Sequence, residues 1–406
     1  YIEWLNFASE ADINEPPTKW LAKDRFNKPM GAFTHYFPDV FSPIWQEHAV
    51  RESRKLLEGD GWALKNPETI GYWTDNEWAY GDLYDFIWGD TAIHAFIDWL
   101  QGRNTLPSVD KLFEESGSSI DLDVINGFEK LIPYQSIAEL NESWSSDYFT
   151  YNYRSFEQIA SEKDLLIRGH DDPVSQDIQQ FVRLMYKLYV DTVIDNIRSV
   201  EAEFSKQTGH KTSHLIFSNR FSIDTPAALS TIRKNMDLFN RFDVIAVNLY
   251  PGYNMSAGYY PRSLLKMIKQ TFHDTTGKPL YISEFGIAAE DASHCDREPC
   301  LSVRRWRPHT VTTQQERGDA YESIISVLSN LPWVVGANWF QWTNGYTGPR
   351  GSDPRNSGIV RDDDTFYEPL SRAMKKVNQQ VSKMRRTKDF SYEDINWPQT
   401  VITICE

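Results

Sequence analysis

The sequence predicts an α/β protein of the (β/α)8 barrel class, and three observations support this prediction. Six short apolar runs recur along the chain, each preceded by Gly, Pro or Asp residues that are typical of turns. Stretches with the periodicity of amphipathic helices separate these runs. Polar and charged residues follow directly after several of the runs, where the carboxyl ends of barrel strands would lie. Continuous apolar strands that alternate with helices indicate a parallel sheet covered on both faces.

The predicted elements follow one another in regular order. The strands are residues 30–36, 69–74, 214–218, 244–249, 279–283 and 334–340. The helices include residues 44–57, 174–206, 225–238, 262–272, 314–331 and 369–386, each of which opens near a Ser, Thr, Asp or Pro. A closed barrel needs eight strands, and residues 1–27 are too few for two βα units of about 30 residues each. Either the first two strands are missing from this chain, which we favour, or the sheet is open.

This reading divides the chain into three parts. Residues 1–27 form an N-terminal segment leading into the barrel, residues 28–386 form the catalytic barrel, and residues 387–406 form a C-terminal tail. Residues 82–172, which are rich in aromatic side chains, Ser and Asp, form a long insertion after the strand 69–74. Insertions at the carboxyl ends of barrel strands build active sites. The insertion is therefore either one wall of a cleft or a helical decoration that adds stability.

Composition excludes several classes of function. The chain of 406 residues holds 42 Lys and Arg against 57 Asp and Glu, a net charge of −15, which disfavours nucleic acid as a partner. No apolar run approaches the roughly 18 residues of a membrane span, so no membrane partner is expected. Its 14 Trp, 20 Tyr and 22 Phe are typical of a protein that binds sugar rings. No signal peptide is visible after Tyr1, but we expect a secreted or periplasmic protein whose leader is absent here.

Cysteine, histidine and acidic clusters give little support to metal or cofactor chemistry. Cys295 and Cys300 could form a disulfide across a short loop or remain free thiols, and Cys405 is the third cysteine. The His residues form no ligand pair at helical spacing, and no phosphate-binding or dinucleotide-binding motif is present. The acidic run 362–364 is interpreted as a solvated turn. We expect no metal and no cofactor.

Two glutamates stand at the ends of predicted strands. Glu77 follows the run Gly-Tyr-Trp-Thr-Asp-Asn, and Glu284 closes the strand 279–283 before Phe-Gly. Catalytic groups of barrels gather at this end of the strands. Hydrolysis of a glycosidic bond needs such a pair, with one carboxyl protonated to donate to the leaving oxygen and the other ionised. Asn76 is suited to donate a hydrogen bond to a sugar hydroxyl.

Further polar and aromatic residues at the strand ends are candidates for substrate binding. Tyr250 is also placed to donate a hydrogen bond to a nucleophilic carboxylate. Trp339 or Trp342 could form the floor of a sugar subsite. The full set of candidates is Trp73, Asn76, Asn219, Arg220, Asn248, Tyr250, Trp339, Gln341 and Trp342.

The strand motifs resemble those of glycoside hydrolase family 50, the β-agarases, and more broadly the clan A retaining glycosidases. The motifs are GYWTDNE at residues 71–77, HLIFSNRF at 214–221, FDVIAVNLY at 242–250, KPLYISEFG at 278–286 and VGANWFQ at 335–341. The resemblance spans roughly residues 28–380, in order. It implies a (β/α)8 barrel whose strands three to eight are visible here. It also implies that Glu77 is the acid/base after the Asn of strand four, and that Glu284 is the nucleophile at the end of strand seven.

The predicted function is hydrolysis of the β-galactosidic linkages of agarose or agaro-oligosaccharides by a retaining double displacement. The negative net charge favours a neutral galactan over a sulfated one. Two alternatives remain open: another clan A β-glycosidase, such as a β-galactosidase, and a carbohydrate-binding barrel without catalytic activity. The departures from the family pattern are the missing first two strands, the insertion and the Cys295/Cys300 loop, and they leave the exact substrate open.

Overall fold

The structure is a computed structural model of the chain. It describes residues 2–7, 20–28, 37–77, 87–103, 132–163, 165, 172–222, 232–250, 262–292, 310–344, 356–361 and 363–384. The chain divides into two compact units, which are treated one at a time below. Unit 1 comprises Tyr1–Asn219 with Thr225–Asp243, and unit 2 comprises Arg220–Asp224 with Val244–Glu406.

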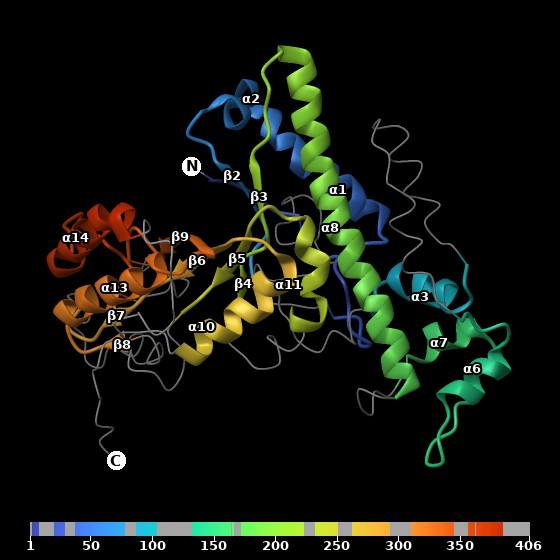
Figure 1. Cartoon of the computed structure of the whole chain (residues 1–406). Helices are drawn as coiled ribbons and strands as arrows, with labels where there is room; N and C mark the ends of the chain where they lie inside the picture. The colour runs from blue at the N-terminus through green and yellow to red at the C-terminus, as the bar shows by residue number, and fades with distance from the viewer. Residues whose placement is uncertain are drawn as a thin grey trace, which may run out of the picture. The chain divides into compact units, whose positions relative to one another are not determined.

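Unit 1 contains three strands and a set of helices (Figure 1). In chain order they are β1 (Ile2–Leu5), α1 (Pro43–Arg54), η2 (Lys55–Leu57), α2 (Glu58–Lys65), β2 (Gly71–Thr74), α3 (Ala92–Leu100), α6 (Ile137–Trp144), α7 (Phe156–Glu162), α8 (Pro173–Thr208), β3 (Leu215–Phe217) and η4 (Met236–Arg241).

The strands of unit 1 form a parallel sheet in the order β1-β2-β3. Ile2 lies opposite Gly71, and Gly71 lies opposite Leu215. A side chain at Gly71 would place its Cβ 2.1 Å from the Leu215 carbonyl oxygen, so this close approach requires glycine. Tyr72 and Trp73, next along β2, are buried and anchor the strand in the core.

The strand β1 was not predicted. Its four residues are Ile-Glu-Trp-Leu, in which a glutamate interrupts the apolar side chains, and they stand at the start of the sequence. β1 pairs with β2. Residues 30–36, which were predicted as the strand before β2, lie outside the described residues. The first 27 residues therefore already contribute a strand to the sheet.

Helix α8 is the longest element of unit 1 and packs along α1 (Figure 1). It begins at Pro173, whose missing N–H costs nothing in the first turn, and ends at Thr208, after which Gly209 adopts φ 71°. Aromatic side chains line the contact, as shown by the ring of Tyr189 stacked on that of Trp45 of α1 with 6.0 Å between centroids. The apolar stripe of α8 thus supplies much of the core of this unit.

Unit 2 is built on a second parallel sheet, in the order β4-β5-β6-β9. Its elements are β4 (Phe221–Ser222), β5 (Ile245–Asn248), α10 (Arg262–Ile268), the π-helical η5 (Lys269–His273), α11 (Asp274–Thr276), β6 (Leu280–Phe285), β7 (Ala288–Ala289), β8 (Thr310–Val311), α13 (Gln314–Ser329), β9 (Val334–Trp339) and α14 (Glu368–Met384). Helix α13 begins with a capping box between Thr313 and Glu316 and packs against α14 (Figure 1).

The α/β class with parallel strands is confirmed, and the predicted strands from β2 onward agree with the structure to within a few residues. The described strands form three sheets, β1-β2-β3, β4-β5-β6-β9 and β7-β8, and no closed barrel, so barrel closure is not confirmed. Cys295, Cys300, Cys405 and the tail 387–406 lie outside the described residues. In the part of the chain that the structure describes, no helix combines the length and apolar character needed to cross a membrane.

Candidate active site

The carboxylate of Glu284 lies at the end of β6 in unit 2, and each of its oxygens has its own donor. Nη1 of Arg220 lies 2.8 Å from Oε1, and the phenol of Tyr250 donates to Oε2 at 2.8 Å. Glu284 is 9% exposed. Charge-assisted bonds of this kind are about twice as strong as neutral ones. The hydrogen bond predicted between Tyr250 and Glu284 is therefore present, and the carboxyl group is held from two sides.

The strand ends around Glu284 are irregular in ways that serve its placement. The register between β5 and β6 shifts between Val247 and Asn248, which brings Asn248 opposite Glu284. Such bulges are common beside active sites because they redirect a side chain. The next contacts lock this register: Ser283 donates to the buried Asn248 Oδ1 at 2.6 Å, and the Leu249 amide donates to the Glu284 carbonyl at 2.8 Å.

Arg220 reaches Glu284 from an unusual backbone conformation. Its φ is 49°, in the left-handed region, and its side chain is almost completely buried. A residue other than glycine held there costs of order 1–3 kcal/mol, and such residues gather at functional sites. Sequence analysis proposed Arg220 as a sugar ligand. The structure shows it as the ion-pair partner of Glu284, and its contact with a sugar stays a prediction.

Glu77, the other predicted catalytic carboxyl, follows β2 in unit 1. The parallel ladder ends at Asp75, whose amide donates to the Leu5 carbonyl at 2.9 Å. Asp75 and Glu77 both have positive φ, 58° and 29°. Asp75 is buried, whereas Asn76 and Glu77 are partly exposed. The strand thus ends in a sharply turned segment that presents Asn76 and Glu77 toward solvent.

Two of the predicted aromatic ligands have packing roles. Trp73 is 6% exposed, and its ring lies 4.7 Å from that of Phe217. The ring of Trp339 lies edge-on to Phe285 and Tyr321, at 5.4 and 5.6 Å, and its indole donates to the Ser357 carbonyl. Neighbouring side chains of a strand point to opposite faces, so Trp339 lies on the side of Phe285 and α13 and away from Glu284. A sugar contact by either tryptophan stays a prediction that this packing does not support.

Trp342, by contrast, is 62% exposed and meets the ring of Phe366 edge-on. It remains the aromatic candidate for a sugar subsite in unit 2. Gln341 is held by Ser357, to whose hydroxyl its amide donates at 3.2 Å. Asn219, in unit 1, is buried.

Sequence analysis missed Arg317, a buried guanidinium on α13. It donates to the carbonyls of Ile287 and Gly358 at 2.6 and 2.9 Å, and it lies over the rings of Trp339 and Tyr367. Burial lowers the pKa of this guanidinium. Arg317 therefore fixes the segment that carries Trp339 and Ser357. An arginine among the apolar positions of a predicted helix was the available signal.

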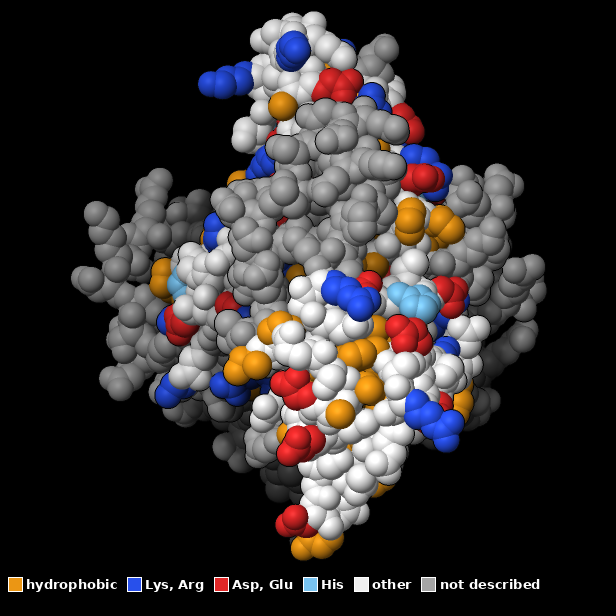
Figure 2. All heavy atoms as spheres, turned by 90° about the vertical axis from the view of Figure 1, so that its right-hand side faces the viewer, with side chains coloured by type: hydrophobic (Ala, Val, Ile, Leu, Met, Phe, Trp, Pro, Cys, Tyr) orange, Lys and Arg blue, Asp and Glu red, His pale blue; other side chains and the backbone are white. Residues whose placement is uncertain are grey.

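Among the described residues, no group of three or more His, Cys, Asp or Glu side chains is placed to hold a metal ion. Figure 2 shows acidic and basic side chains interspersed over one face, without a continuous run of Lys and Arg among the side chains that it colours. A sulfated polymer would need such a run.

Comparison with known proteins supports the relationship that the strand motifs indicate. β-Agarase B of Vibrio sp. (strain JT0107) is 37% identical over 261 residues, which cover 63% of this chain and 23% of that protein. The resemblance to the family 50 β-agarases is confirmed. This chain thus spans about a quarter of the curated relative that it matches. No family model matches the chain.

Solved structures agree on the fold. The structure of PfGH50B aligns with 87% of this chain, with a TM-score of 0.56 and 19% sequence identity. The structure of an exo-β-agarase aligns with 86% of this chain, with a TM-score of 0.55 and 22% sequence identity. A cold-adapted β-galactosidase from Rahnella sp. R3 covers 95% with 0.54 at 13%. This chain covers 43%, 39% and 46% of those three structures. The two units therefore share the α/β fold of these glycosidases.

Proposed function

We propose that this chain carries the catalytic centre of a retaining β-glycosidase that hydrolyses the β-galactosidic linkages of agarose or agaro-oligosaccharides. The observation that carries the proposal is the carboxylate of Glu284, held by Arg220 on one oxygen and Tyr250 on the other. A nucleophilic carboxylate must be aimed at the anomeric carbon, and these two donors fix its orientation. Similarity to β-agarase B supports the galactan substrate.

The reaction has two steps that mirror each other. In the first, a Glu284 oxygen bonds to the anomeric carbon while the glycosidic C–O bond breaks, and the leaving oxygen takes the proton of Glu77. In the second, Glu77 takes a proton from water, the water oxygen bonds to the anomeric carbon, and the Glu284 carboxylate leaves. The sugar is released with its original configuration, and both carboxyls return to their starting states.

The remaining strand-end groups are proposed to bind the sugar. Asn76 stands next to Glu77 and would donate to a hydroxyl of the ring at the cleavage point, and Trp342 would stack on a neighbouring ring. A neutral galactan suits the net charge of −15 better than a sulfated one. We further propose that the whole protein closes this α/β fold into a (β/α)8 barrel, and that it acts outside the cytoplasm as a secreted or periplasmic enzyme.

Small nucleophiles test the two assignments separately. Glu284→Ala with azide should give a glycosyl azide of inverted configuration, because azide enters where the carboxylate attacked. Glu77→Ala with azide should give the retained configuration, because azide then attacks the glycosyl-enzyme. Glu290→Gln, at an exposed glutamate of unit 2, is the matched control and should keep full turnover.

The outcomes separate the readings that the sequence left open. Release of shorter sugars from agarose by the parent supports the agarase assignment. Turnover confined to small aryl β-galactosides favours a β-galactosidase. A folded parent that binds agaro-oligosaccharides without cleaving them is a binding protein, and the proposal is then wrong.

A further inference from the structure

Asp75 is a buried carboxyl that the reaction above does not use. It is fully buried at the carboxyl end of β2, two residues before Glu77. A buried carboxylate is costly unless it is hydrogen-bonded, so its partner reveals what it does. The phenol of Tyr189, from the middle of α8, donates to Asp75 Oδ2.

Tyr189 is a rigid donor. It is fully buried, its ring stacks on that of Trp45 with 6.0 Å between centroids, and the ring of Phe37 lies at the same distance on another side. A tyrosine packed in this way loses little freedom when its hydroxyl forms a hydrogen bond. The oxygen that meets Asp75 is therefore fixed in space by the core of unit 1.

The backbone of Asp75 is fixed as well. Its amide donates to the Leu5 carbonyl at 2.9 Å, which extends the ladder between β1 and β2 by one residue. Just before it, the Thr74 hydroxyl donates to the Phe217 carbonyl at 3.0 Å, toward β3. The end of β2 is thus tied to β1 through the amide of Asp75, to β3 through the hydroxyl of Thr74, and to α8 through the side chain of Asp75.

This anchoring sits where the backbone leaves its ordinary conformation. Asp75 has φ 58° and Glu77 has φ 29°, which residues other than glycine adopt only when surrounding contacts impose them. Without the bond from Tyr189, Asp75 would lose a hydrogen bond that helps to hold its side chain inward. The turn after β2 could then relax, and Glu77 would move with it.

We propose that Asp75 and Tyr189 form a positioning pair that sets the direction in which Glu77 delivers its proton. The inference rests on the function proposed above. Neither residue touches the substrate, and the pair acts only through the two residues that follow Asp75. Loss of the pair should therefore impair the step that needs Glu77 as an acid more than it impairs substrate binding.

Leaving-group dependence measures this effect directly. Proton donation matters for a sugar leaving group and hardly at all for 2,4-dinitrophenolate, which departs unaided. The value of kcat/KM reports the first step alone, so it should be compared between an agaro-oligosaccharide and the 2,4-dinitrophenyl glycoside of the same β-galactosyl unit. For Tyr189→Phe we expect a loss of about tenfold or more on the oligosaccharide and of less than about twofold on the aryl glycoside.

Two further variants complete the experiment. Tyr186→Phe removes a buried hydroxyl one turn away on α8, where the ring packs on Phe37 and Phe239, and it should leave both substrates unaffected. Asp75→Asn keeps an oxygen that can accept from Tyr189, so its selective loss should be smaller than that of Tyr189→Phe. If circular dichroism shows that Tyr189→Phe does not fold, Asp75→Asn replaces it in the comparison. We then expect Asp75→Asn to lower kcat/KM on the oligosaccharide only.

The outcomes distinguish this inference from the proposed function. A parent inactive on both substrates overturns the proposed function and this inference with it. An active parent, together with losses that are equal on the two substrates or absent from both, overturns the positioning role alone.

Discussion

Arg220 and Glu284 form an ion pair of 2.8 Å in which only 8% of the arginine side chain and 12% of the glutamate side chain are exposed. The backbone of Arg220 has a left-handed conformation, and the phenol of Tyr250 donates a hydrogen bond to the second carboxylate oxygen of Glu284. A buried pair of this kind is vulnerable to loss of one partner, because the other charge is left without compensation. The geometry therefore makes Glu284 sensitive to each donor separately.

Arg220→Met is expected to lower kcat/KM by about 10² to 10³-fold, because breaking a buried pair costs roughly 3–5 kcal/mol. Arg220→Lys keeps the charge and should retain intermediate activity. Steady-state kinetics on an agaro-oligosaccharide provides the measurement. Arg183→Met, which removes the exposed pair with Asp237, is the control and should be nearly silent. Full activity of Arg220→Met would show that the pair is dispensable.

Tyr250→Phe is expected to lower kcat/KM by about 10 to 100-fold, since a hydrogen bond to a charged group contributes about 1.5–3 kcal/mol. The comparison is Tyr281→Phe, which removes a hydroxyl that donates to Asn338 in the same unit and should change activity by less than about twofold. Equal losses in the two variants would mean that the effect of Tyr250 is not specific to Glu284.

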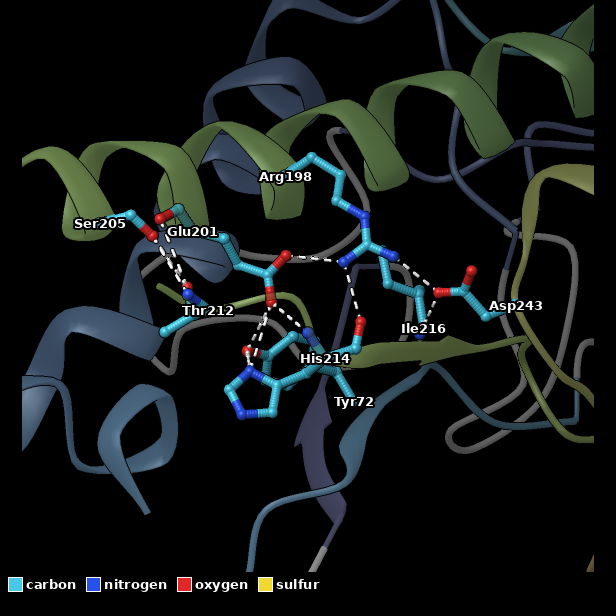
Figure 3. Close-up of polar contacts among 8 residues, drawn as sticks. All are labelled: Tyr72, Arg198, Glu201, Ser205, Thr212, His214, Ile216 and Asp243. Atoms are coloured by element: carbon cyan, nitrogen blue, oxygen red, sulfur yellow. Dashed lines mark hydrogen bonds and ion pairs between the residues drawn. The ribbon is translucent and has the colours of Figure 1, made fainter. Parts of the chain in front are cut away.

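Glu201→Gln is expected to destabilise unit 1 by about 1–3 kcal/mol. Figure 3 shows why: the buried Glu201 of α8 accepts from Tyr72, from the backbone amide of His214 and from Arg198, at 3.1, 2.8 and 2.6 Å. The loss should be visible as a lower midpoint of urea unfolding. The control is Glu203→Gln, two residues further along α8. It alters an exposed ion pair with Arg54 and should shift the free energy of unfolding by no more than about 0.5 kcal/mol.

High pH should remove the contribution of Tyr134. Burial raises the pKa of this phenol to about 12, and its hydroxyl donates to Asp177 at 2.9 Å. The folded pKa exceeds the unfolded value of about 10, so the contribution is complete below pH 10 and is lost as the pH rises through about 12. The difference in melting temperature between the parent and Tyr134→Phe should therefore shrink between pH 9 and about 12. A constant difference would contradict the assignment.

Apolar runs predicted most of the fold because buried parallel strands and their helices have distinctive periodicities. The strand β1 was not predicted because Ile2–Leu5 is short and a glutamate interrupts its apolar side chains. Barrel closure was predicted from the resemblance, whereas the described strands form three separate sheets. Closure depends on contacts between distant parts of the chain, on which local patterns carry no information.

The candidate site was predicted in composition but only partly in arrangement. Strand ends located Glu284 and Tyr250, and their hydrogen bond follows from the pairing of neighbouring strands. The same reasoning could not tell that Arg220 pairs with Glu284, because side-chain reach is not visible in a sequence. The pairing of Trp339 with Phe285 was not visible in the sequence either. Residues opposite each other on neighbouring strands share a face of the sheet, so Trp339 lies on the face of Phe285.

Helix α8 also explains where this protein tolerates changes in length. Tyr189 holds the carboxyl end of β2 through Asp75, and Glu201 holds its amino end through Tyr72. Twelve residues separate the two contacts on the helix, a distance of about 18 Å. One inserted or deleted residue between them would rotate one contact by about 100° relative to the other. Related chains should therefore vary in loop length around α8 while keeping this spacing unchanged.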